Sequence, residues 1–145
     1  MLINIDPILG PEVLHTLRAM GHGDKLILCD SNFPAYSMNS VVHRLDGVDA
    51  AKAAKAILSI FPLDSFIEFP ILRMQIDNKP DELNDVHKEI IDVTRSVAGE
   101  NWKIGSIERF MFYEEAKKAF AIITTNETRC LLYTSDAADD MQCRS

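Results

Sequence analysis

Short apolar runs alternate with helical patterns along most of the chain, and this alternation is the feature that most constrains its fold. The predicted strands cover residues 25–30, 41–42, 71–76, 103–107 and 120–125. The predicted helices cover residues 11–20, 50–61, 81–97 and 109–118. Strands that alternate with helices are typical of an α/β protein, so the sequence predicts a layered sheet with helices on its faces.

Turn and cap residues set the expected limits of the helices. Pro11 suits the first turn of a helix, and Gly21 is expected to end that helix. Asp49 is a candidate N-cap for the second helix, which Pro62 terminates.

Composition limits the classes of protein to which this chain can belong. Its 145 residues are 47% hydrophobic and 26% charged, which suits one globular domain with a core of its own. A net charge of -7 without a cluster of basic residues argues against nucleic-acid binding. No apolar run approaches the roughly 20 residues of a membrane span, and the start lacks a signal sequence, so we expect a cytoplasmic protein. Three cysteines without a CxxC spacing suggest neither a disulfide framework nor a zinc site.

The segment most suggestive of chemistry is a histidine between two glycines. His22 follows the first predicted helix, and Asp30 stands at the end of the next predicted strand. Glycines allow a tight turn that can hold an imidazole outside the core. Since histidine titrates near neutrality, this turn is a candidate site of proton transfer.

Four segments together carry a resemblance to a known family. They are Met20–Asp24, Asp30–Ala35, Arg109–Glu114 and Lys117–Ile122. In this order and spacing, the chain from residue 1 to about residue 129 resembles the L-fucose mutarotase and D-ribose pyranase (FucU/RbsD) family. The loop containing phenylalanine and proline and the Phe-Tyr-Glu segment resemble the fucose branch more than the ribose branch.

The resemblance implies an enzyme that interconverts the α and β anomers of a free monosaccharide, with L-fucose as first choice and D-ribose as second. It implies that His22 is the proton donor, and that Asp30 and Arg109 bind the sugar. It further implies a homo-oligomer with pockets near subunit boundaries. The reaction opens and recloses a hemiacetal ring, so we expect no cofactor and no metal.

Each of these residues also has an alternative interpretation without a role in catalysis or sugar binding. Asp30 and Asp24 could be ordinary loop or capping residues, Arg109 could be a partner in a surface ion pair, and His22 alone could be a structural histidine. The chain could also be a non-catalytic accessory protein for sugar binding or transport, with His22 chemically idle.

Other residues are expected to serve the structure. His43 and His87 lack a partner at metal-ligand spacing. The spacing of Phe110, Phe112 and Ala116 predicts a helix packed on the core. Tyr113 and Glu114 are expected to pack there and not to line a pocket.

Two departures from the family pattern concern the site and the end of the chain. Tyr36 stands where some relatives carry another histidine. Residues 130–145 replace a Tyr-Gly-Asn segment and a closing strand, and their first eleven residues resemble a translated transposon-end adapter used in DNA sequencing. We therefore expect a family domain over residues 1–129 that lacks its closing strand and part of its pocket, followed by a non-native tail.

Overall fold

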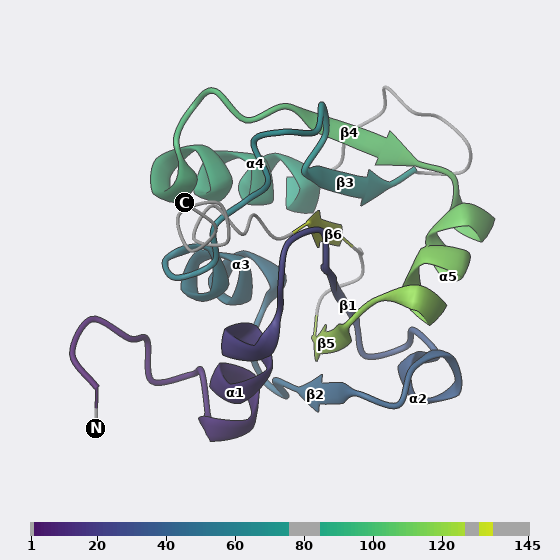
Figure 1. Cartoon of the computed structure of the whole chain (residues 1–145), viewed down its shortest axis with the longest axis horizontal. Coiled ribbons are helices and arrows are strands. Elements are labelled where there is room, and N and C mark those ends of the chain that lie inside the picture. The colour runs from purple at the N-terminus through teal and green to yellow at the C-terminus, as the bar shows by residue number, and fades with distance from the viewer. Residues whose placement is uncertain (1, 76–84, 127–130, 135–145) are drawn as a thin grey trace.

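The described part of the chain forms one mixed sheet with helices on both faces. The structure is a computed structural model that describes residues 2–75, 85–126 and 131–134. Within these residues six strands pair in the order β2-β5-β1-β6-β3-β4 (Figure 1). The strands are β1 (Lys25–Asp30), β2 (Val42–Arg44), β3 (Ile71–Met74), β4 (Ile104–Ile107), β5 (Ala121–Thr125) and β6 (Leu131–Thr134). The helices are α1 (Pro11–Ala19), α2 (Ala35–Met38), α3 (Ala50–Leu58), α4 (Asp85–Ala98) and α5 (Arg109–Lys118). The predicted α/β class is confirmed.

Strand β1 divides the core between the two faces of the sheet. Leu26 and Leu28 pack in the cluster that includes α1, α3 and α4, while Ile27 and Cys29 pack in the cluster that includes α2 and α5. All four side chains are fully buried. Successive residues of a strand point to opposite faces, so a strand covered on both sides must be apolar throughout.

The helix starts agree with the capping residues. Pro11 is the first residue of α1. The Asp49 carboxylate accepts a hydrogen bond of 2.7 Å from the Lys52 backbone N–H at the start of α3. The Glu108 side chain plays the same part for α5, where it accepts from the Met111 backbone N–H at 3.1 Å. Each of these two caps satisfies one N–H group that the first turn of a helix leaves unpaired.

The expectation that the closing strand is missing is wrong. Leu131–Thr134 forms β6, which runs antiparallel to both of its neighbours and lies between β1 and β3. All four residues are buried. An apolar, β-favouring stretch of this length can form backbone hydrogen bonds on both sides whatever its origin, so the sheet of the described structure includes residues beyond 129.

Further differences concern short elements and element limits, and β2 covers Val42–Arg44 rather than the predicted residues 41–42. The short helix α2 was not predicted, and α3 ends at Leu58 rather than at the predicted residue 61. The predicted last residue of β3, residue 76, and the predicted first residue of α4, residue 81, lie outside the described residues. No helix among the described residues has the length and apolar character to cross a bilayer.

Strand β6 also carries a poorly accommodated polar group. Tyr133 is fully buried, and its hydroxyl has no hydrogen-bond partner in the described structure. Burial raises the pKa of Tyr133 far above its ordinary value, so the phenol stays neutral. An unsatisfied buried hydroxyl costs about 1–3 kcal/mol of desolvation.

We therefore expect Tyr133→Phe to stabilise the protein. The substitution keeps the ring and removes the unpaired hydroxyl, so the free energy of unfolding should rise by about 1 kcal/mol. Urea denaturation followed by circular dichroism measures this change. The matched control is Tyr36→Phe, because Tyr36 is 68% exposed and its hydroxyl can bond to water. A Tyr133→Phe protein less stable than the parent would contradict the prediction.

Candidate active site

His22 stands at the tip of a tight turn between α1 and β1. The Gly21 backbone N–H donates to the Asp24 carboxylate at 2.7 Å, and the Asp24 N–H donates to the Gly21 carbonyl at 3.1 Å. Gly23 has a φ of 82°, a left-handed conformation that favours glycine. Asp24 thus closes the turn, as its capping interpretation predicted. The turn leaves the His22 side chain exposed rather than packed in the core.

An aromatic side chain from a distant segment contacts the imidazole. The ring centroids of His22 and Phe66 lie 6.2 Å apart in an edge-to-face arrangement. Phe66 belongs to the loop before β3 and is itself 63% exposed. Nothing in the sequence pattern linked this loop to the turn, because contacts between loops leave no periodic signal.

Asp30 is the last residue of β1 and lies at the carboxyl end of the strand, whereas the His22 turn precedes its amino end. Strands β1 and β5 are parallel, and Asp30 is the register partner of Thr125 at the end of β5. The Thr125 hydroxyl donates to the Cys29 carbonyl at 3.2 Å, which ties the two strand ends together. Asp30 is partly buried there, at the carboxyl edge where parallel sheets commonly bind ligands.

Arg109 starts α5 at the same carboxyl edge. It follows β4, which is parallel to β3, and its exposed guanidinium lies 5.1 Å from the centre of the Phe110 ring. Phe33, from the loop after Asp30, packs edge-to-face on Phe112 and Tyr113 with centroids at 5.7 and 5.5 Å. This aromatic contact draws the Asp30 loop toward the first turns of α5.

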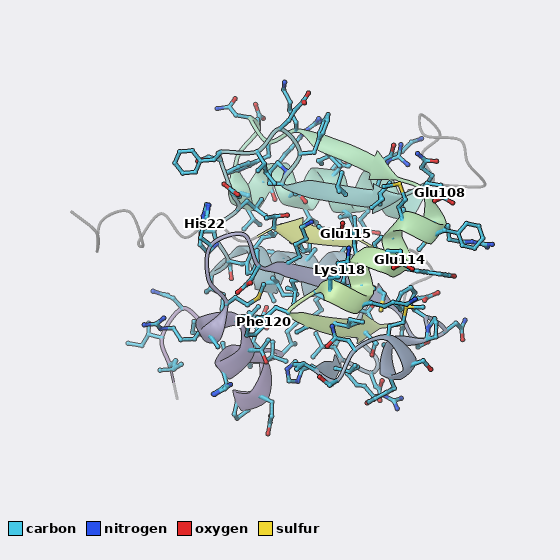
Figure 2. All side chains as sticks on the ribbon, turned by 45° about the vertical axis from the view of Figure 1, so that its right-hand side comes forward. His22, Glu108, Glu114, Glu115, Lys118 and Phe120 are labelled. Carbon is cyan, nitrogen blue, oxygen red and sulfur yellow. The ribbon has the colours of Figure 1, made fainter. Side chains whose placement is uncertain are left out.

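The three predicted site residues therefore form two groups within one chain. Asp30 and Arg109 share the carboxyl edge of the sheet, while His22 precedes the first residue of β1. Strand β1 has six residues, so at a rise of about 3.3 Å per residue its ends are about 17 Å apart. Figure 2 agrees: His22 lies at one side of the molecule, and Glu108, next to Arg109 in sequence, lies at the other.

Two other predictions can be judged from the structure. His43 is partly buried, with its Nε2 atom 2.6 Å from the Thr16 hydroxyl, and burial lowers its pKa. This agrees with a structural role. The expectation that Phe110 packs on the core is wrong, because Phe110 is 62% exposed while Phe112 is fully buried. Residues two apart on a helix point in nearly opposite directions, so both could not face the core.

Some expectations fall outside what the structure describes. The side chain of His87 is one, and Cys130, where the replacement of the Tyr-Gly-Asn segment is expected to begin, is another. Residues 135–145 of the expected non-native tail are a third. Within the described ranges, no group of three or more His, Cys, Asp or Glu side chains could hold a metal ion.

Comparisons with known proteins identify the family. Residues 3–132 match the RbsD/FucU transport protein family. An L-fucose mutarotase of Actinobacillus pleuropneumoniae is 39% identical over 129 residues, which cover 88% of each chain. The crystal structure of protein Atu2016 is 45% identical, with a TM-score of 0.88 over 94% of this chain and 95% of that one. The fucose mutarotase of Streptococcus pneumoniae, solved in complex with L-fucose, is 30% identical, with a TM-score of 0.84 over 93% and 98%. The chain belongs to the RbsD/FucU family.

Proposed function

We propose that this chain is a cofactor-independent mutarotase that interconverts the α and β anomers of a free monosaccharide, with L-fucose as its substrate and D-ribose as the second candidate. The single observation that carries the proposal is 39% identity to an L-fucose mutarotase over 88% of both chains. The similarity to a fucose mutarotase solved with L-fucose supports the same substrate class.

The reaction needs little more than proton transfer. A proton goes to the ring oxygen while another leaves the anomeric hydroxyl, the C1–O5 bond breaks, and an open aldehyde forms. Rotation about the C1–C2 bond followed by reclosure gives the other anomer. A group that titrates near neutral pH can both donate and accept the proton. We assign this role to His22, whose exposed imidazole can approach a substrate.

We assign substrate binding to Asp30 and Arg109. A carboxylate accepts hydrogen bonds from neighbouring sugar hydroxyls, and a guanidinium donates to sugar oxygens. Both residues lie at the carboxyl edge, and the packing of Phe33 on α5 supports their approach to one ligand.

One chain alone cannot bring these groups to one sugar, because about 17 Å of strand separates His22 from Asp30. We therefore propose that the site forms between two copies, with His22 of one copy beside Asp30 and Arg109 of the next. Such a contact joins two different surfaces, and repeated contacts of this kind form a ring when the rotation between neighbouring copies closes.

Exposed apolar side chains at both edges support this assembly. Phe66 and Ile67, 63% and 41% exposed, lie in the loop that contacts His22. Near Arg109, Phe110 and Met111 are more than half exposed and line a groove of about 350 Å³ that also includes Met38. Burying large apolar side chains against each other favours association.

The first test removes the proposed proton donor. In His22→Ala, acceleration of anomer exchange in L-fucose should fall at least about 100-fold, as general acid–base catalysis typically contributes. Nuclear magnetic resonance exchange spectroscopy on the anomeric protons measures this rate. The control is His15→Ala. His15 is exposed on neighbouring α1, so its loss should leave the rate of anomer exchange unchanged.

Two outcomes would count against this assignment. Unchanged exchange in His22→Ala would reject His22 as the proton donor. A parent protein that binds L-fucose without accelerating exchange would instead indicate the non-catalytic accessory protein.

The second test asks whether the site is shared between copies. His22→Ala and Asp30→Asn proteins, each inactive alone, should regain activity when unfolded together and refolded as a mixture. Random assembly would give about a quarter of the sites both native residues. The control mixture, Asp30→Asn with Arg109→Gln, should stay inactive because both defects fall on the same side of the contact. No recovery in the first mixture would contradict a shared site.

A further inference from the structure

A second groove lies beside the start of β4. Its volume is about 520 Å³, and its walls come from β3, α4, the loop that joins α4 to β4, the first residue of β4, and Phe69 of the loop before β3. Neither His22, Asp30 nor Arg109 lines it. The groove is therefore a separate feature that the proposed mutarotase reaction does not use.

The groove gathers positive charge in an acidic protein. Arg73 of β3, Arg95 of α4 and Lys103 of the loop line it, together with one carboxylate, Glu100. The whole chain carries a net charge of -7, so this excess of cations runs against its overall composition. Among the described side chains, neither Arg95 nor Lys103 forms an ion pair.

One of these cations is held within the protein, and an aromatic ring also lines the groove. Arg73 is only 6% exposed, so its position is fixed by the packing around β3. The indole N–H of Trp102 donates to the Ala98 carbonyl at 2.7 Å, which fixes the ring at the end of α4. A fixed cation and a fixed aromatic wall give the groove a preformed shape, which lowers the entropic cost of binding a ligand.

We propose that this groove binds a phosphate monoester of a small sugar or polyol. Guanidinium groups donate paired hydrogen bonds to phosphate oxygens, and a dianion offsets the repulsion among the cations. The volume is within the range of small-molecule sites. Trp102, which lines the groove, offers apolar surface for the carbon skeleton. The proposal does not depend on the mutarotase assignment.

Trp102 is the only tryptophan of the chain, so its fluorescence reports on the groove directly. Titration with glucose 6-phosphate should give a saturable change, inorganic phosphate a weaker one, and glucose none. Added salt should weaken the binding, because part of it is electrostatic between exposed groups. Equal affinities for glucose 6-phosphate and inorganic phosphate would overturn the assignment to an ester, and no saturable change with either would overturn the site.

Two variants and a matched control test whether the exposed cations of the groove bind the phosphate. Arg95→Gln and Lys103→Gln should each weaken glucose 6-phosphate binding about tenfold, as the loss of one charged hydrogen bond implies. Both residues are exposed, so both variants should fold, which circular dichroism checks. Lys52→Gln removes an exposed cation from α3 outside the groove and should bind like the parent. Equal weakening in Lys52→Gln, or no weakening in Arg95→Gln and Lys103→Gln, would overturn the proposal.

Discussion

The four residues of β6 hold the two parts of the sheet together, and the rest of the structure depends on that pairing. On one side lie β2, β5 and β1, and on the other lie β3 and β4. Leu131 pairs with both Leu28 and Arg73, so β6 sets the register of the two parts. It also makes β1 parallel to β3 and β4, so the carboxyl ends of β1 and β4, next to Asp30 and Arg109, lie at the same edge of the sheet.

Most of the fold could be predicted because its signals are local. The run at residues 25–30 was predicted with the limits that β1 has, since apolar residues buried on both faces leave an uninterrupted pattern. Strand β6 could not be predicted in the same way. Its residues are apolar and favour strands, but their position between β1 and β3 follows from pairing with distant segments. The adapter-like sequence of the tail gave no reason to expect a strand.

The candidate site was predicted in its parts but not in its arrangement. Glycines on both sides of His22 indicated a turn that keeps the imidazole out of the core, and the structure has that turn. The contact between His22 and Phe66 is not visible in the sequence, because it joins two loops. The separation of His22 from Asp30 was implicit in the predicted strand, whose length already exceeds the reach of one sugar ring. This separation is the reason for our proposal that His22 of one copy completes the site of the next.

A crystal structure of this protein with L-fucose bound tests the central claim most directly. The account predicts a His22 nitrogen within hydrogen-bond reach of the sugar ring oxygen, about 2.6–3.2 Å, with the histidine supplied by one copy and with Asp30 and Arg109 supplied by its neighbour. A sugar held by Asp30 and Arg109 with no His22 of any copy within reach would contradict it.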